Sequence, residues 1–137
     1  MGDEKLYKND YLFVSRKSDN GHVVALAYNY PDEYLGAVPS GNKKLEAGTS
    51  RSIDLSLSGL KPGTIFKIEI LDKDHGNIHN YWEAMGKPEP PTREQIKVMK
   101  DVANSLKTEI IVADDKGNFN YKHTITPWSL VLIEQIN

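Results

Sequence analysis

The sequence predicts a mainly β fold, an antiparallel β-sandwich of about seven to nine strands with one inserted α-helix over residues 92–106. Short apolar or alternating segments recur along the chain, and turn sequences separate them. One segment of helical periodicity, which follows a proline-rich stretch, interrupts the series. With 137 residues, the chain is expected to form a single domain over 1–137 that can bury a sizeable core.

The first two strands are expected at 11–17 and 22–30, joined by a hairpin turn at Asn20-Gly21. Apolar residues run from Val23 to Tyr28 with almost no polar interruption, which favours a strand buried on both faces. Residues 31–47 are polar and contain glycine, so we expect a long loop there.

Strict alternation predicts two further strands, at 52–58 and 64–71. Between them, Pro62-Gly63 suits a type II turn. One face of each strand is expected to enter the core, and these inward residues are Ile53, Leu55, Leu57, Phe66, Ile68 and Ile70.

Residues 72–107 form a predicted insertion. Residues 72–86 are expected to be a connection that contains a helical turn, and the prolines in 87–91 require an extended chain. Thr92 followed by Gln95 predicts a helix start with a capping box. The helix is expected to end near Leu106, with one apolar stripe made of Ile96, Met99, Val102, Ala103 and Leu106.

Three strands are predicted to close the chain, at 109–113, 119–126 and 129–136. The polar segment 114–118 is expected to be the hairpin turn between the first two.

Composition excludes several classes of function. The net charge of −2 gives no sign of a nucleic-acid or membrane partner, and the absence of cysteine excludes disulfides and thiol chemistry. The N-terminal residues lack the features of a signal peptide, and no apolar run is long enough to cross a membrane. The chain is therefore expected to be soluble and cytoplasmic, and no cofactor is predicted.

Two groups of residues have spacings that partly match metal sites. His75 and His79 have a spacing that allows one metal on a helix, but Gly76 and Asn77 between them make a continuous helix doubtful. Asp72 begins a partial calcium-loop pattern, which fails because Asn77 occupies the position where the loop needs glycine. No metal is predicted.

Catalytic motifs are likewise not found in the sequence. It contains no nucleophile elbow, phosphate loop or zinc-protease helix. Glycoside hydrolysis needs two carboxyl groups at a defined separation. We interpret four candidate carboxylates as surface charges, namely Glu69, Glu83, Glu89 and Glu134.

Aromatic and proline residues are the remaining candidates for a site. They either pack in the core or at an interface, which the large buried area of aromatics favours, or stack on sugar rings as in carbohydrate-binding modules. The candidates for an interface or for sugar stacking are Tyr81, Trp82, Pro90, Pro91 and Trp128.

Over nearly its whole length, the order of features resembles the C-terminal region of glycoside hydrolase family 39, the β-xylosidase family. The most specific resemblance lies in Asp74-His75-Gly76-Asn77, Tyr81, Trp82, Met85-Gly86, Pro88-Glu89-Pro90-Pro91-Thr92 and Gln95. Further resemblance lies in Gly2-Asp3-Glu4, Leu6-Tyr7, Val14-Ser15-Arg16-Lys17, residues 24–30 and residues 127–134. A local resemblance of residues 59–68 to fibronectin type III domains covers far less of the chain.

The family 39 resemblance implies a non-catalytic accessory domain. Retaining hydrolysis of β-xylosides in that family is carried out by two glutamates on a (β/α)8 barrel, and such a barrel alone needs about 250 residues. No catalytic glutamate is therefore carried over to this chain. Residues 1–10 would be a lead-in from the missing barrel. The partners would be that barrel and, in a homo-oligomer, a second copy of the protein. The resemblance also implies that a strand from before the barrel is missing, which would leave one sheet edge unpaired.

Overall fold

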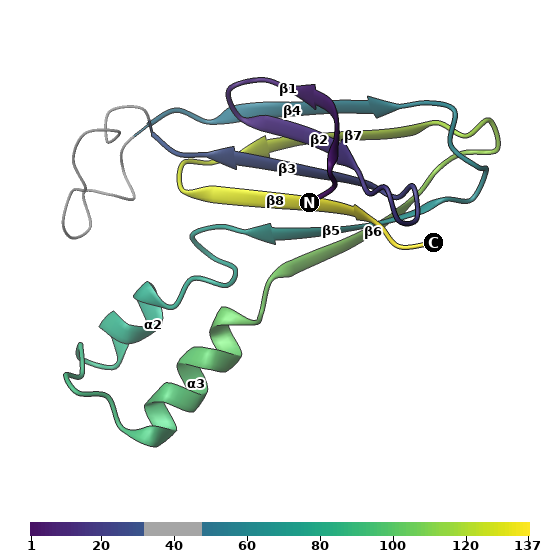
Figure 1. Ribbon diagram of the computed structural model, residues 1–137. Coiled ribbons are helices and arrows are strands. Elements are labelled where there is room, and N and C mark those ends of the chain that lie inside the picture. The colour runs from purple at the N-terminus through teal and green to yellow at the C-terminus, as the bar shows by residue number, and fades with distance from the viewer. Residues whose placement is uncertain (32–47) are drawn as a thin grey trace.

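Two antiparallel sheets form the body of the molecule, and a helical arm projects from them (Figure 1). The computed structural model describes residues 1–31 and 48–137, so the loop expected at 31–47 lies almost entirely outside the described residues. The elements are β1 (Glu4–Lys8), β2 (Leu12–Arg16), β3 (Val23–Asn29), β4 (Arg51–Leu57), β5 (Ile65–Leu71), α2 (His79–Ala84), α3 (Arg93–Ala103), β6 (Lys107–Val112), β7 (Phe119–Ile125) and β8 (Ser129–Gln135).

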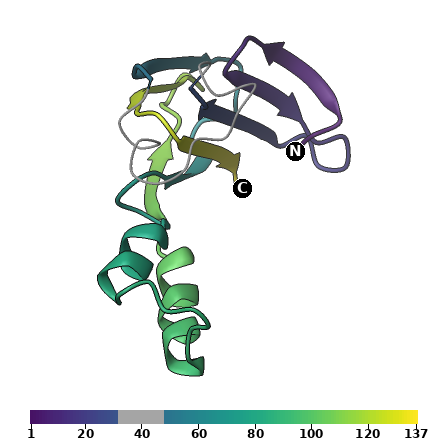
Figure 2. The ribbon, with the colours of Figure 1, turned by 90° about the vertical axis from the view of Figure 1, so that its left-hand side faces the viewer.

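The larger sheet has six strands in the order β1-β2-β3-β8-β5-β6, and the smaller one consists of β4 and β7. Seen from the side, the small sheet lies over one face of the large one (Figure 2). This architecture confirms the predicted mainly β sandwich. Among the described residues, no helix is long and apolar enough to span a membrane.

The core lies between the sheets and consists of their inward-facing side chains. Phe66 of β5 and Phe119 of β7 meet across it, with ring centroids 4.2 Å apart. Fully burying a side chain of this kind stabilises the fold by roughly 1.5–3 kcal/mol. The alternation predicted for β4 and β5 is confirmed, because the inward set is buried except for Leu57, which packs against the core while partly exposed.

The segment 114–118 does not close a hairpin, contrary to the sequence prediction. β6 before it pairs with β5, whereas β7 after it pairs with β4. The segment therefore carries the chain from one sheet to the other. Its turn chemistry is as expected, because Asp114 Oδ1 accepts hydrogen bonds from the backbone N–H groups of Lys116 and Asn118. A turn sequence reverses the chain locally, but the long-range packing of the flanking strands decides which sheet each strand joins.

Residues 1–10, expected to be only a lead-in, contain strand β1. It pairs antiparallel with β2, from Glu4 opposite Arg16 to Lys8 opposite Phe13, with a bulge between Lys5 and Tyr7. All five residues of β1 are exposed. An edge strand in which Leu6 is 39% and Tyr7 51% exposed among charged residues lacks the alternating hydrophobic pattern by which strands are recognised.

The insertion forms an arm of two helices, a short one in the connection and a longer one after the prolines. α2 is the helical turn expected within 72–86, and Thr92 caps α3 as predicted. Both bonds of the capping box are present: Gln95 N–H donates to Thr92 Oγ1 at 3.2 Å, and Thr92 N–H donates to Gln95 Oε1 at 2.8 Å. α3 ends at Ala103 instead of 106. Asn104 and the following serine compete for backbone hydrogen bonds and so disfavour helix continuation.

Candidate functional site

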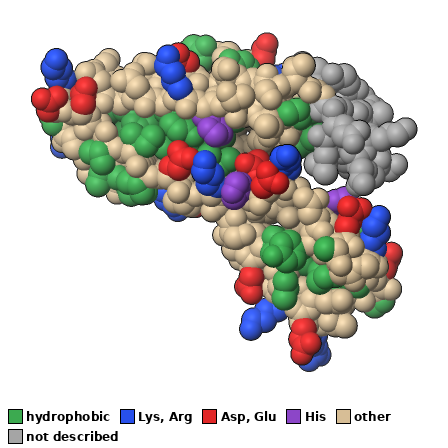
Figure 3. Space-filling view, turned by 180° about the vertical axis from the view of Figure 1, so that it is seen from behind, with side chains coloured by type: hydrophobic (Ala, Val, Ile, Leu, Met, Phe, Trp, Pro, Cys, Tyr) green, Lys and Arg blue, Asp and Glu red, His purple; other side chains and the backbone are tan. Residues whose placement is uncertain are grey.

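The helical arm is the first candidate surface, because it stands clear of the sandwich and neither helix contributes a buried side chain (Figure 2). Several apolar residues of the arm are exposed, including Ile96 and Val98 on α3. Hydrophobic side chains are visible on the arm from behind (Figure 3). An amphipathic helix ordinarily turns its apolar stripe to a core. The arm therefore presents apolar surface that is available for a contact outside the described residues.

Trp82 is fixed within the arm. Its indole N–H donates a hydrogen bond of 3.2 Å to the carbonyl of Pro88, and the Lys87 ammonium lies 5.9 Å from its ring centroid. Tyr81 beside it is 50% exposed. The half-buried Trp82 is thus used for packing, and Tyr81 is the more accessible aromatic. The arm holds four of the five candidate residues, namely Tyr81, Trp82, Pro90 and Pro91.

Asp72 organises the turn at the base of the arm. Its Oδ1 accepts hydrogen bonds from the Asp74 N–H, the His75 N–H and the His75 ring Nδ1, each at 2.8 Å. Partial burial alone would raise the pKa of Asp72, but these hydrogen bonds together outweigh it and hold the pKa below its ordinary value. The carboxylate that begins the partial calcium-loop pattern is therefore already used by the protein's own donors.

The two histidines of the arm do not converge on a common point. His75 contacts Asp72, whereas His79 lies in α2 with its Nδ1 3.9 Å from Glu83 Oε2, which is too far for a hydrogen bond. Gly76 between them has a φ of 73°, so the chain there is not helical. Nowhere in residues 1–31 and 48–137 do three or more His, Asp or Glu side chains gather in a way that could hold a metal ion.

Trp128, the fifth candidate, lies in the turn between β7 and β8, away from the arm helices. Its φ is 64°, an uncommon conformation for a bulky residue, and its N–H donates a hydrogen bond of 2.7 Å to the Asn29 carbonyl. Its ring meets the ring of Tyr30 edge-on, with centroids 4.8 Å apart. The candidate residues therefore occupy two separate places.

Sequence reasoning missed Asn29, which holds this end of the sandwich together. The side chain is 2% exposed, and its Nδ2 donates to the carbonyl of Thr49 at 2.9 Å and to that of Ile125 at 3.0 Å. It thereby ties the end of β3 to the chain before β4 and to the end of β7. An asparagine at the end of an apolar run gives no sequence signal of such a role, since both partners are distant in the chain.

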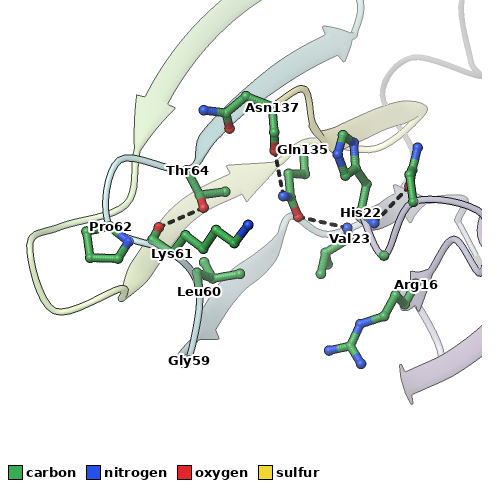
Figure 4. A pocket seen from close by; sticks show the side chains of 12 residues that line it. Arg16, His22, Val23, Gly59, Leu60, Lys61, Pro62, Thr64, Gln135 and Asn137 are labelled. Carbon is green, nitrogen blue, oxygen red and sulfur yellow. Dashed lines mark hydrogen bonds between the residues drawn. The ribbon is translucent and has the colours of Figure 1, made fainter.

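A pocket of about 550 Å³ lies at the other end of the sandwich, between the β2–β3 turn, the β4–β5 turn and the C-terminal residues (Figure 4). Several of its polar groups bond to one another: Gln135 accepts from Val23 N–H at 3.1 Å, and Thr64 Oγ1 donates to the Lys61 carbonyl at 2.7 Å. The described residues that line it include neither aspartate nor glutamate. It offers no carboxyl pair for glycoside hydrolysis.

A second groove, of about 540 Å³, runs between β1–β2 and the outer edge of β4. Its floor includes Leu12, Val14 and Leu55. Asp54 is the one carboxylate among the described residues that line it, and it lies 3.0 Å from the Lys122 ammonium. The groove therefore combines an apolar floor with the edge of a strand that pairs only with β7 among the described strands.

Three of the four glutamates interpreted as surface charges form ion pairs with lysines. The contacts are Glu69 with Lys67 at 2.8 Å, Glu83 with Lys87 at 2.9 Å, and Glu134 with Lys17 at 2.7 Å. The hydrogen bond from Lys17 lowers the pKa of Glu134. A general acid in a glycosidase needs a raised pKa, so the direction at Glu134 is opposite to that requirement.

Comparison with known proteins places the chain among glycoside hydrolases. The model of the family described as "Glycosyl hydrolases family 39" matches residues 1–120. A curated β-xylosidase from Geobacillus stearothermophilus is 26% identical over 134 residues, which cover 98% of this chain and 24% of that protein. The chain thus spans about a quarter of the length of this relative.

Solved structures share the fold. A family 39 enzyme from Xanthomonas axonopodis pv. citri superposes with a TM-score of 0.68 at 9% identity, covering 95% of this chain and 26% of that one. A family 39 β-xylosidase from Caulobacter crescentus superposes with a TM-score of 0.64 at 17% identity, covering 97% of this chain and 24% of that one. With the family model matching residues 1–120, the chain belongs to glycosyl hydrolase family 39.

Proposed function

We propose that the chain is the non-catalytic C-terminal β-sandwich domain of a longer family 39 β-xylosidase, in which it supports a (β/α)8 catalytic barrel. The observation that carries the proposal is the pair of coverages: 98% of this chain aligns with only 24% of the β-xylosidase relative. A barrel needs about 250 residues, and the 137 residues here already form a sandwich and an arm. Further support comes from the pockets described above, each of which lacks a pair of carboxyl groups.

The arm is one proposed contact with the barrel or with a second copy of the protein. Tyr81, Ile96 and Val98 expose apolar surface beside a proline-rich connection. Interfaces combine such apolar and aromatic side chains with a polar rim. In this proposal the arm extends the domain's reach, so that it contacts a neighbour without disturbing the sandwich core.

The groove beside β4 is the proposed place of the strand expected from before the barrel. An added strand there would pair with the free edge of β4 and cover the apolar floor of the groove. Without that strand, the free edge is available for self-association. Sedimentation of the chain at increasing concentration measures this, and a strict monomer up to millimolar concentration would count against it.

A hybrid enzyme tests the supporting role. In the Geobacillus stearothermophilus β-xylosidase, the quarter that aligns with this chain is replaced by it, and the hybrid is compared with the same enzyme truncated at that point. The proposal predicts that the hybrid retains xylosidase activity and resists heat better than the truncated form. A truncated enzyme equal to the hybrid in both respects would overturn the supporting role.

A carbohydrate-binding module is the second candidate, and the exposure of Tyr81 is the observation in its favour. A stacking platform needs a flat aromatic face open to solvent. Titration of the chain with xylo-oligosaccharides, followed by tryptophan fluorescence, distinguishes the two functions. Saturable quenching that Tyr81→Ala abolishes would favour the module, whereas no change at millimolar sugar favours the supporting domain.

A further inference from the structure

The outer face of the six-stranded sheet, which points away from β4 and β7, carries an unusual amount of apolar surface. Register places Tyr28 of β3, Leu130 of β8 and Leu71 of β5 directly side by side, and these are 42%, 39% and 37% exposed. A second row beside them consists of Phe13, Leu26 and Leu132, all half-buried. We call these six residues the outer patch: Phe13, Leu26, Tyr28, Leu71, Leu130 and Leu132.

A sheet with one face in water ordinarily alternates apolar and polar residues along each strand. β3 does not: Val23, Ala25 and Ala27 point into the core, while Leu26 and Tyr28 on the opposite face are also apolar. The sequence therefore predicts burial on both faces, yet among the described residues no layer covers Leu26 and Tyr28 on the outward face, which are half-buried and exposed respectively. Contiguous exposed apolar patches on soluble proteins mark interaction sites.

Charged pairs border the outer patch. Lys17 and Glu134 meet at 2.7 Å, and Lys67 and Glu69 meet at 2.8 Å, all on the same face of the sheet. An apolar centre with a charged rim is the usual composition of a protein interface.

The start of the chain lies on this same face. Ser15 points outward and is fully covered, and its Oγ accepts a hydrogen bond of 2.9 Å from the Gly2 N–H. In Figure 1 the N-terminus accordingly lies in front of the large sheet. Gly2 fits because a Cβ there would lie 2.2 Å from the Arg16 carbonyl oxygen. Any polypeptide that precedes residue 1 would approach the domain from this side.

We infer that the outer patch is the docking surface for the catalytic barrel of the longer enzyme; this rests on the proposed function and names the contact. The exposed apolar rows supply the buried centre of the interface, and the lysine–glutamate pairs supply its rim. The barrel is favoured over a second copy because the chain enters at this face, which puts a preceding domain within immediate reach. Tethering raises the effective concentration of the two surfaces, so a modest patch is sufficient for docking.

The hybrid enzyme tests the assignment by thermal unfolding. The double variant Leu71→Lys with Leu130→Lys places charges in the outer patch, and Tyr81→Lys with Val98→Lys charges the arm in the same way. Ile136→Lys, near the C-terminal end, is the control outside both surfaces. All five side chains are partly exposed, so each lysine can reach water in the isolated chain. We expect the unsubstituted hybrid and the Ile136→Lys control to unfold in one transition. The patch variant should separate into two, while the isolated chain carrying the same substitutions keeps its own midpoint.

Other results would overturn the assignment in distinguishable ways. If the arm variant separates the transitions and the patch variant does not, docking uses the arm, and the proposed function stands without this inference. If the unsubstituted hybrid is no more stable than the truncated enzyme, the proposed function fails as well. If the isolated chain sediments as a dimer that Leu130→Lys converts to a monomer, the outer patch is a contact between copies.

Discussion

Replacing Asn29 by alanine removes a buried side chain that joins the two sheets at the arm end of the sandwich. Its bond to the Ile125 carbonyl is buried, and losing it leaves that acceptor unsatisfied at a cost of roughly 1–3 kcal/mol. Its bond to the Thr49 carbonyl is only partly buried, so water replaces it at a cost of about 0.5–1.5 kcal/mol. The expected loss in the free energy of unfolding is therefore about 2–4 kcal/mol.

Urea unfolding of the 137-residue chain measures this loss. Asn120→Ala is the matched control, because Asn120 is exposed and its side chain bonds only to the exposed Ser56 among the described residues. This substitution should lower the free energy of unfolding by less than about 0.5 kcal/mol.

Asn29→Asp should destabilise the fold at least as much as Asn29→Ala at neutral pH, since a buried carboxylate would face two carbonyl oxygens. Because burial raises the pKa of the introduced carboxyl group, that deficit should shrink as the pH falls. A loss at Asn29→Ala no greater than at Asn120→Ala would refute the reasoning.

Three further outcomes are expected. Thr92→Ala should destabilise α3 by about 1 kcal/mol, which amide exchange in α3 would show as a roughly fivefold faster rate. The urea midpoint of the sandwich should stay unchanged, because α3 buries no side chain. A shifted midpoint would contradict the independence of the arm. Gly117→Ala should lower the free energy of unfolding by more than about 1 kcal/mol, because φ is +74° and the new Cβ would lie 2.1 Å from the Leu60 carbonyl oxygen. A variant as stable as the wild type would contradict this turn geometry. The lowered pKa of Asp72 means that its stabilising contribution is present above the unfolded-state pKa of about 3.9 and is lost as the pH falls through the folded value. Protection of the His75 amide from hydrogen exchange should accordingly decrease in acid in the wild-type chain. In Asp72→Asn this protection should not depend on pH. Equal acid sensitivity in both proteins would show that the Asp72 hydrogen bonds do not hold the turn.

Features set by local chemistry were predictable from the sequence. The alternation in β4 and β5 reports directly which side chains enter the core, and the Thr92–Gln95 spacing specifies a capping box whatever lies around it. The Lys61–Thr64 turn is also local: Gly63 adopts a φ of 78°, and Thr64 N–H donates to the Lys61 carbonyl at 3.1 Å.

Features that depend on distant parts of the chain were not predictable. β1 was missed because an exposed edge strand has no hydrophobic face, and 114–118 was misassigned as a hairpin turn because turn residues do not specify sheet membership. The apolar outward residues of β3 predicted burial on both faces, but among the described residues Leu26 is only half-buried and Tyr28 is exposed. The role of Asn29 needed the two sheets to be in place before its partners could be identified.

The proposed supporting role is tested most directly by the hydrolytic activity of the purified 137-residue chain on an aryl β-xyloside. A domain whose described pockets hold no carboxyl pair, and which spans 24% of its β-xylosidase relative, should release the aryl group no faster than buffer alone. The hybrid enzyme assayed in parallel should be active. Saturable hydrolysis by the isolated chain, proportional to its concentration and retained through repeated purification, would contradict the account.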